Sequence, residues 1–172
     1  PNAVILTAVI DALEQRDVAT VDVPGAFLQT EMPDDEEPVH IRFTGKMAML
    51  LAQEYPEVYG RYLITKRNGD KVLYTMANKA IYGTLKAALL FWKKLKGKLI
   101  EWGLESNPYD SCTVNKMIDG SQATIVWHVD DLKIGYTRTD VVTRIINNLQ
   151  TEFGQTSPLT VNRGKVHEYL GM

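Results

Sequence analysis

Two adjacent carboxylates, Asp130 and Asp131, stand where a strand of apolar residues should turn back on itself. The run 124–129 is rich in β-branched and aromatic residues, Asp is a favoured turn residue, and 132–136 reads as the return strand. We therefore expect a hairpin with an Asp130-Asp131 turn at its tip. Like charges held this close raise each other's pKa, so an ionised pair implies a bound cation, most plausibly Mg²⁺ with its preference for oxygen ligands. The alternative is a solvated Asp-Asp turn.

A third carboxylate, Asp22, lies in the β-branched run 19–23, which should form another strand. Pro24 and Gly25 follow and indicate a turn into a short helix that includes Phe27. A lone carboxylate in a buried strand is uncommon unless it is paired or bound to a metal, although a strand-end Asp can also cap the next helix. Asp22 can share a cation with Asp130 and Asp131 only if its strand lies beside the hairpin.

Composition limits the classes of protein to which the chain can belong. Its 172 residues are 45% hydrophobic, enough for one proper core, and 19 basic against 21 acidic residues give a formal charge of −2. This balance does not indicate a nucleic-acid binder, so any basic surface must be local. A single cysteine, Cys112, excludes an internal disulfide framework and fits an intracellular compartment. No apolar run is long enough to span a membrane, and no signal-peptide pattern is present.

Hydrophobic periodicity predicts helices at 2–15, 46–53, 87–102 and 139–153. We expect the first to face the core through Ile5, Val9, Ile10 and Leu13. We expect the second to be buried through Met47, Leu50 and Leu51. The lysines of the third helix are interpreted as a solvated face, with phosphate contact as the alternative. Together with the strands, these helices predict an α+β fold in which helices pack on one face of the sheet.

The other segments should be strands and loops. Residues 39–43 alternate like a half-exposed strand, and 62–65 with 72–74 should form a hairpin joined by a type I′ turn at Asn68-Gly69. Residues 31–37 are interpreted as an acidic surface loop, with a metal site as the lesser alternative. Residues 167–172 have the character of a further strand.

Five short blocks, in this order, resemble the reverse transcriptase of Ty1/copia-type LTR retrotransposons over essentially the whole chain. The blocks are Val21-Asp22-Val23-Pro24-Gly25-Ala26-Phe27-Leu28 (D-V-x-x-A-F-L in the family), Ile81-Tyr82-Gly83 with Phe91-Trp92 (L-Y-G…W), Asp110-Ser111-Cys112 (D-x-C), His128-Val129-Asp130-Asp131 (Y-V-D-D) and Tyr169-Leu170-Gly171 (F-L-G). The resemblance implies an antiparallel polymerase palm with part of the fingers. It also implies that the chain begins after most of the fingers and ends before the thumb, connection and RNase H regions.

The resemblance also implies roles for individual residues. The catalytic carboxylates would be Asp22, Asp130 and Asp131, which with Val23 would hold two Mg²⁺ ions, replaceable by Mn²⁺. The nucleotide-binding residues would be Gly25 and Ala26 through their N–H groups, Phe27 under the sugar, and Lys86. The primer-binding residues would be His128, Val129, Tyr169, Leu170 and Gly171. Phe27 has an alternative role as a core residue that anchors its helix.

Two positions depart from the family pattern. His128 replaces its tyrosine, and Lys86 or a neighbour stands where it has a glutamine. The implied partners are an RNA or DNA template with its primer, deoxynucleoside triphosphates and the rest of a retrotransposon polyprotein, in a cytoplasmic virus-like particle. Two other functions stay open: a palm without catalysis that binds nucleic acid or protein, and a metal-dependent phosphohydrolase.

Overall fold

The computed structural model describes residues 2–33 and 38–171, and the chain divides into two compact units. The first unit combines the segment up to Thr30 with the segment from Tyr82 onward, and the second is Glu31–Ile81. The α+β prediction is confirmed. Within the described residues, no helix is long and apolar enough to cross a membrane.

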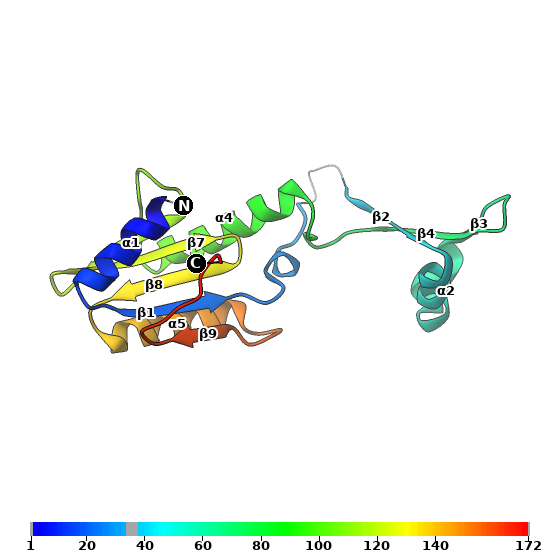
Figure 1. Ribbon diagram of the computed structural model, residues 1–172. Coiled ribbons are helices and arrows are strands. Elements are labelled where there is room, and N and C mark those ends of the chain that lie inside the picture. The colour runs from blue at the N-terminus through cyan, green and yellow to red at the C-terminus, as the bar shows by residue number, and fades with distance from the viewer. Residues whose placement is uncertain (1, 34–37, 172) are drawn as a thin grey trace. The chain divides into compact units, whose positions relative to one another are not determined.

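The first unit is built on a six-stranded antiparallel sheet, which the described residues form in the order β5-β6-β7-β8-β1-β9 (Figure 1). Its strands are β1 (Asp17–Asp22), β5 (Glu105–Ser106), β6 (Thr113–Ile118), β7 (Ser121–His128), β8 (Asp131–Tyr136) and β9 (Thr160–Arg163). Its helices are α1 (Asn2–Leu13), α4 (Leu85–Glu101), α5 (Thr139–Phe153) and the four-residue 3₁₀ helix η1 (Ala26–Gln29). Strand β1 therefore lies between β8 and β9, and its pairing with β8 places Asp22 next to the acidic hairpin.

In the part of the second unit that the structure describes, the chain forms a three-stranded sheet and short helices. Its elements are β2 (His40–Thr44), α2 (Gly45–Glu54), α3 (Pro56–Tyr59), the 3₁₀ helix η2 (Gly60–Tyr62), β3 (Leu63–Thr65) and β4 (Lys71–Met76), with strand order β2-β4-β3. The β3–β4 hairpin was predicted correctly. Its turn is not type I′, because only Gly69 has a positive φ, of 86°. Residues 34–37 of the acidic loop lie outside the described residues.

The prediction that α2 is buried through Met47, Leu50 and Leu51 is wrong for Met47 and Leu50, and Leu51 is only half-buried. Ala48 and Ala52 are buried, whereas Met47 and Leu50 are each about half exposed. The close approach of α2 to β4 explains this, because small side chains permit that approach and the larger ones are left on the outer side of the helix.

The helices do not all pack on one face of the six-stranded sheet, which corrects that part of the prediction. Helix α1 covers β7 and β8 on one side, and α5 covers β1 and β8 on the other (Figure 1). The face under α1 carries Lys133, and strand alternation turns Leu132 and Ile134 to the opposite face. There α5 buries its apolar side, made of Val141, Val142, Ile145, Leu149 and Phe153.

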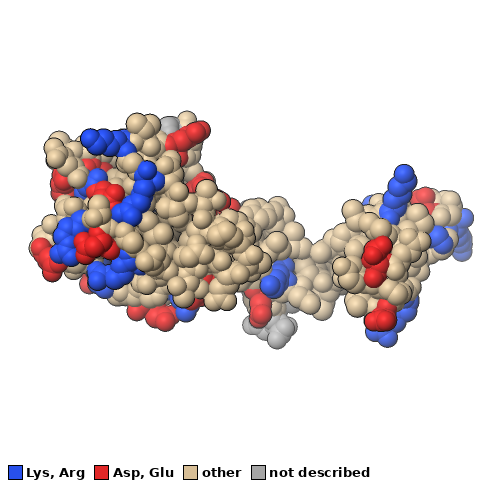
Figure 2. Space-filling model, turned by 90° about the horizontal axis from the view of Figure 1, so that it is seen from below, with Lys and Arg blue, Asp and Glu red and all other residues tan. Residues whose placement is uncertain are grey.

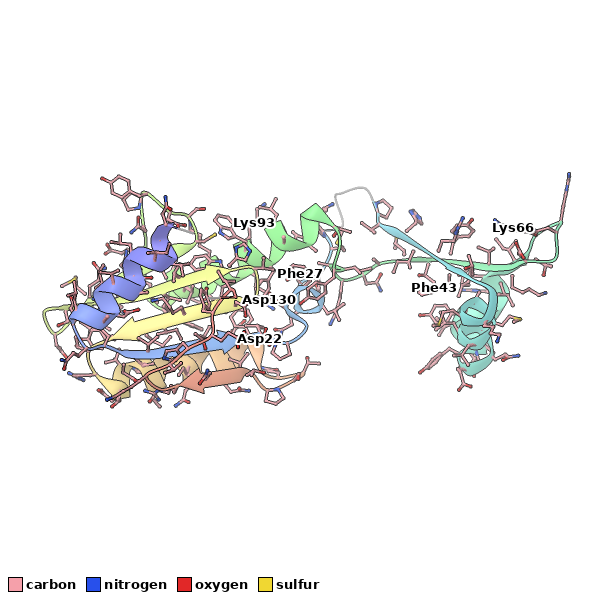
Figure 3. All side chains as sticks on the ribbon, in the orientation of Figure 1. Asp22, Phe27, Phe43, Lys66, Lys93 and Asp130 are labelled. Carbon is pink, nitrogen blue, oxygen red and sulfur yellow. The ribbon has the colours of Figure 1, made fainter. Side chains whose placement is uncertain are left out.

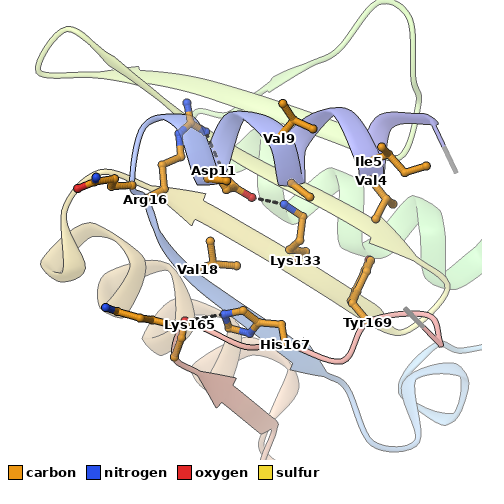
Figure 4. A pocket seen from close by; sticks show the side chains of 14 residues that line it. Val4, Ile5, Val9, Asp11, Arg16, Val18, Lys133, Lys165, His167 and Tyr169 are labelled. Carbon is orange, nitrogen blue, oxygen red and sulfur yellow. Dashed lines mark hydrogen bonds and ion pairs between the residues drawn. The ribbon is translucent and has the colours of Figure 1, made fainter.

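Helix α1 also presents a different side to the sheet from the one expected. Val4, Thr7 and Asp11 are buried, whereas Ile5, Val9 and Leu13 are 55%, 51% and 80% exposed. The reason is a buried ion pair between Asp11 and Lys133 of β8, drawn in Figure 4, which orients the helix. A Cβ on Gly135, also on β8, would overlap the Asp11 carboxylate, so glycine permits this close approach.

Candidate active site

Asp22 and Asp131 stand directly opposite each other on neighbouring strands. Strand β1 pairs with β8 in a register that ends at Asp22↔Asp131, so the two side chains share one face of the sheet. Asp130 lies in the adjoining turn, and its backbone carbonyl accepts a hydrogen bond from the Val23 N–H at 3.1 Å. Figure 3 shows Asp22 and Asp130 at the same end of the sheet. Asp22 is therefore brought to the same end of the sheet as Asp130 and Asp131, which lie more than a hundred residues later in the sequence.

The turn lies one residue earlier than expected. The predicted Asp130-Asp131 turn is wrong, because β7 ends at His128, β8 starts at Asp131, and Val129 and Asp130 form the turn. The pairing of His128 with Asp131 leaves only two residues for the connection. Consequently strand pairing fixes the position of Asp131, whereas the Asp130 side chain projects from a turn.

The electrostatics of the three carboxylates are those of a repelling cluster. Burial raises the pKa of Asp22, and the charge of Asp130 raises it further. Burial also raises the pKa of Asp131, with further contributions from Asp130 and Asp22, and His128 acts in the opposite direction. Because the charged forms are disfavoured in the fold, this free-energy cost is present above the raised pKa values and disappears as the pH falls through them. A cation between the carboxylates would relieve the same cost.

The donor set fits a hard divalent cation, since it consists of carboxylate oxygens, from Asp22 and Asp131 on one face of the sheet and from Asp130 in the adjoining turn. Among the described residues, no three His, Cys, Asp or Glu side chains are arranged closely enough to hold an ion. The Asp130 Oδ2 accepts a hydrogen bond from the Tyr82 hydroxyl at 2.9 Å. No chemical role was predicted for Tyr82, although it belongs to one of the five blocks.

The segment after Asp22 forms a tight turn that leads to Phe27. Gly25 has a φ of 63°, and the Ala26 N–H donates to the Val23 carbonyl at 3.2 Å. That hydrogen bond conflicts with the prediction that the Ala26 N–H holds triphosphate oxygens. It also occupies one lone pair of the Val23 carbonyl oxygen, and Val23 was predicted to help hold the metal ions.

Phe27 is an inward-facing residue of η1. Its side chain is 6% exposed, and its ring contacts those of Tyr82 and Phe91, with centroid distances of 4.2 and 6.3 Å. The carbonyl at the end of η1, on Gln29, accepts a hydrogen bond from Lys94 of α4 at 2.8 Å. Lys86, the other residue predicted to bind nucleotide, lies in the first turn of α4.

The predicted primer-binding residues are brought near Asp131 at two points. His128 pairs with Asp131 across the hairpin, and the Tyr169 hydroxyl donates to the Asp131 carbonyl at 3.0 Å. Leu170 and Gly171 follow with positive φ values of 53° and 74°. The expectation of a strand at 167–172 is wrong for the described residues of that segment. The strand that extends the sheet is β9, because its residues pair with β1 while Tyr169 packs over the hairpin.

Val129 holds a backbone conformation that disfavours its side chain. Its φ is 58°, in the left-handed region, and a β-branched residue there costs of the order of 1–3 kcal/mol. Val129→Gly should therefore raise the free energy of unfolding by about 1 kcal/mol, after the added entropy of the unfolded chain is subtracted. Urea denaturation measures the change. Val129→Ala keeps the Cβ and should gain less, and a loss of stability in Val129→Gly would contradict the prediction.

Comparisons with models of protein families, with curated proteins and with solved structures found no match to this chain.

Proposed function

We propose that this chain is the palm, with part of the fingers, of an RNA-directed DNA polymerase that adds deoxynucleotides to a primer 3′-hydroxyl. The observation that carries the proposal is the register Asp22↔Asp131, with Asp130 in the adjoining turn. Nucleotidyl transfer needs a rigid set of carboxylates at one end of a surface that nucleic acid can reach. The five blocks that resemble retrotransposon reverse transcriptases support the same reading.

In this proposal Asp22, Asp130 and Asp131 would hold two Mg²⁺ ions, for which Mn²⁺ can substitute. When bound, such ions lower the pKa of the attacking hydroxyl and neutralise charge on the triphosphate and its leaving group. The chain's own contribution is to orient. Strand pairing fixes Asp22 and Asp131, and the bond from Tyr169 to the Asp131 carbonyl ties the predicted primer-binding segment to the same strand.

The partners in this proposal are a primed RNA or DNA template and deoxynucleoside triphosphates, in the setting of a retrotransposon polyprotein and its particle. The formal charge is −2, and basic side chains lie interspersed with acidic ones on the face of the molecule shown in Figure 2. Few phosphates can then be neutralised together, so duplex binding by this chain alone should be weak and should fall steeply with salt.

Primer extension tests the function. A chain extended to include complete fingers and thumb should add deoxynucleotides to a primer on an RNA template with Mg²⁺ or Mn²⁺. Binding of primed template without extension would support a palm that has lost catalysis. Hydrolysis of phosphate esters without template-dependent addition would support a phosphohydrolase. Either result would overturn the proposal.

Phe27→Val tests the predicted contact with the sugar. Because the ring is buried against Tyr82 and Phe91, the substitution should lower the free energy of unfolding by about 2 kcal/mol. In the extended chain it should also increase the use of ribonucleotides relative to deoxynucleotides, since it empties the volume that excludes a 2′-hydroxyl.

Denaturation and the incorporation ratio separate these two effects. Leu28→Val is the matched control, because Leu28 is the next residue and its side chain is 50% exposed. This variant should change neither quantity by much. Lower stability of Phe27→Val with an unchanged ratio would leave Phe27 with a packing role alone.

A further inference from the structure

Tyr82 joins the aromatic core of the first unit to the acidic turn. Its hydroxyl donates to Asp130 Oδ2 at 2.9 Å, and its ring lies on Phe27 with centroids 4.2 Å apart. The side chain is 51% exposed, so one side of the ring is packed and the other faces solvent. Tyr82 is therefore both anchored and accessible beside a carboxylate of the candidate site.

The anchor continues deep into the core. The ring of Phe27 contacts Phe91 of α4, whose ring contacts Phe153 of α5 at a centroid distance of 5.9 Å. Phe91 and Phe153 are 1% and 0% exposed. A row of four rings thus runs from the helices behind the sheet to the hydroxyl that meets Asp130. Close packing of this kind restricts the ring of Tyr82 to few positions.

Asp130 needs such a partner more than the other two carboxylates do. Asp22 and Asp131 are residues of paired strands, and their directions follow from the pleat of the sheet. Asp130 lies in the turn, where no strand pairing orients its side chain. The hydroxyl of Tyr82 engages Oδ2, and Oδ1 of the same carboxylate takes no part in that hydrogen bond.

We propose that Tyr82 is the positioning residue of Asp130: its hydroxyl holds one carboxylate oxygen so that the other is presented to a divalent cation shared with Asp22 and Asp131. The inference rests on the proposed function, because it assumes that these carboxylates bind a cation. Hydrogen-bond partners of metal-ligating carboxylates fix the orientation of the ligand, and their removal usually lowers metal affinity about 10- to 100-fold.

Mn²⁺ titration of the 172-residue chain, followed by electron paramagnetic resonance, tests the inference without any need for catalysis. Tyr82→Phe keeps the ring on Phe27 and removes only the hydroxyl, so its melting temperature should stay close to that of the unaltered chain. Its Mn²⁺ dissociation constant should rise about ten-fold. Tyr74→Phe removes the hydroxyl of a tyrosine exposed on β4, in the other unit, and should leave the constant unchanged.

Asp130→Asn separates failure of the inference from failure of the proposed function. If Asp130→Asn weakens Mn²⁺ binding and Tyr82→Phe leaves it unchanged or tightens it, the positioning role is overturned and the cation site stands. If Asp130→Asn has no effect on Mn²⁺ binding, the cation site itself is overturned, and the role of Tyr82 with it. Tyr82→Leu also removes the ring contact with Phe27, and should weaken Mn²⁺ binding while lowering the melting temperature.

Discussion

Asp130→Asn should reduce primer extension by an extended, active chain roughly a thousand-fold, while the protein stays folded. The substitution removes the charge that stabilises the transition state and keeps a residue that turns tolerate. Single-nucleotide addition under fixed Mg²⁺ measures the loss. Asp119→Asn is the matched control, because Asp119 is also an aspartate of a hairpin turn, between β6 and β7, and its side chain is 67% exposed, so this variant should retain activity.

The melting temperature without metal provides a second test of the Asp130→Asn variant. Asp130 contributes to the raised pKa of both Asp22 and Asp131, so Asp130→Asn removes repulsion from the fold. At neutral pH its melting temperature without metal should equal or exceed that of the unaltered chain. Near-normal nucleotide addition by this folded variant would contradict the catalytic assignment.

Asp11→Ala should lower the free energy of unfolding by about 3 kcal/mol or more, the largest stability effect that we expect. Both partners of the Asp11–Lys133 ion pair are 6% exposed, so removal of one leaves a buried charge without its counter-ion. Urea denaturation at neutral pH measures the change. Asp140→Ala breaks an exposed pair with Arg138 and should cost much less stability than Asp11→Ala.

A double variant identifies the cause of the loss. Asp11→Leu combined with Lys133→Met replaces the pair by apolar side chains of similar length, and should recover most of the stability lost in Asp11→Ala. If the double variant is as unstable as Asp11→Ala, the unpaired Lys133 is not the cause of the loss, and the cause is packing under α1 or Arg16, which also pairs with Asp11 at 3.7 Å.

The sequence predicted most of the elements because their patterns are local. The period of α5, the β-branched runs of β1 and β7 and the Asn-Gly hairpin each depend on a few neighbouring residues. The pairing of β1 with β8 is not local. It was expected only because a cation site would need Asp22 beside the hairpin. In the structure, the register of β1 on β8 places Asp22 opposite Asp131.

The features that the sequence did not predict arise from tertiary contacts. The orientation of α1 depends on an ion pair with a lysine far along the chain, which outweighs the apolar stripe of Ile5, Val9 and Leu13. The turn differs by one residue because strand pairing, and not the preference of Asp for turns, sets where β8 begins. The contact of Tyr82 with Asp130 leaves no trace in periodicity, because it joins two turns.

The close approach of α1 to Gly135 constrains how this sequence can vary over evolution. A side chain at position 135 and a carboxylate at position 11 compete for the same space. A homologue that replaces Gly135 by alanine or serine should therefore carry a smaller residue in place of Asp11, and Lys133 should then be replaced by an uncharged residue. Positions 11, 133 and 135 should change together, so that selection acts on the three as one unit.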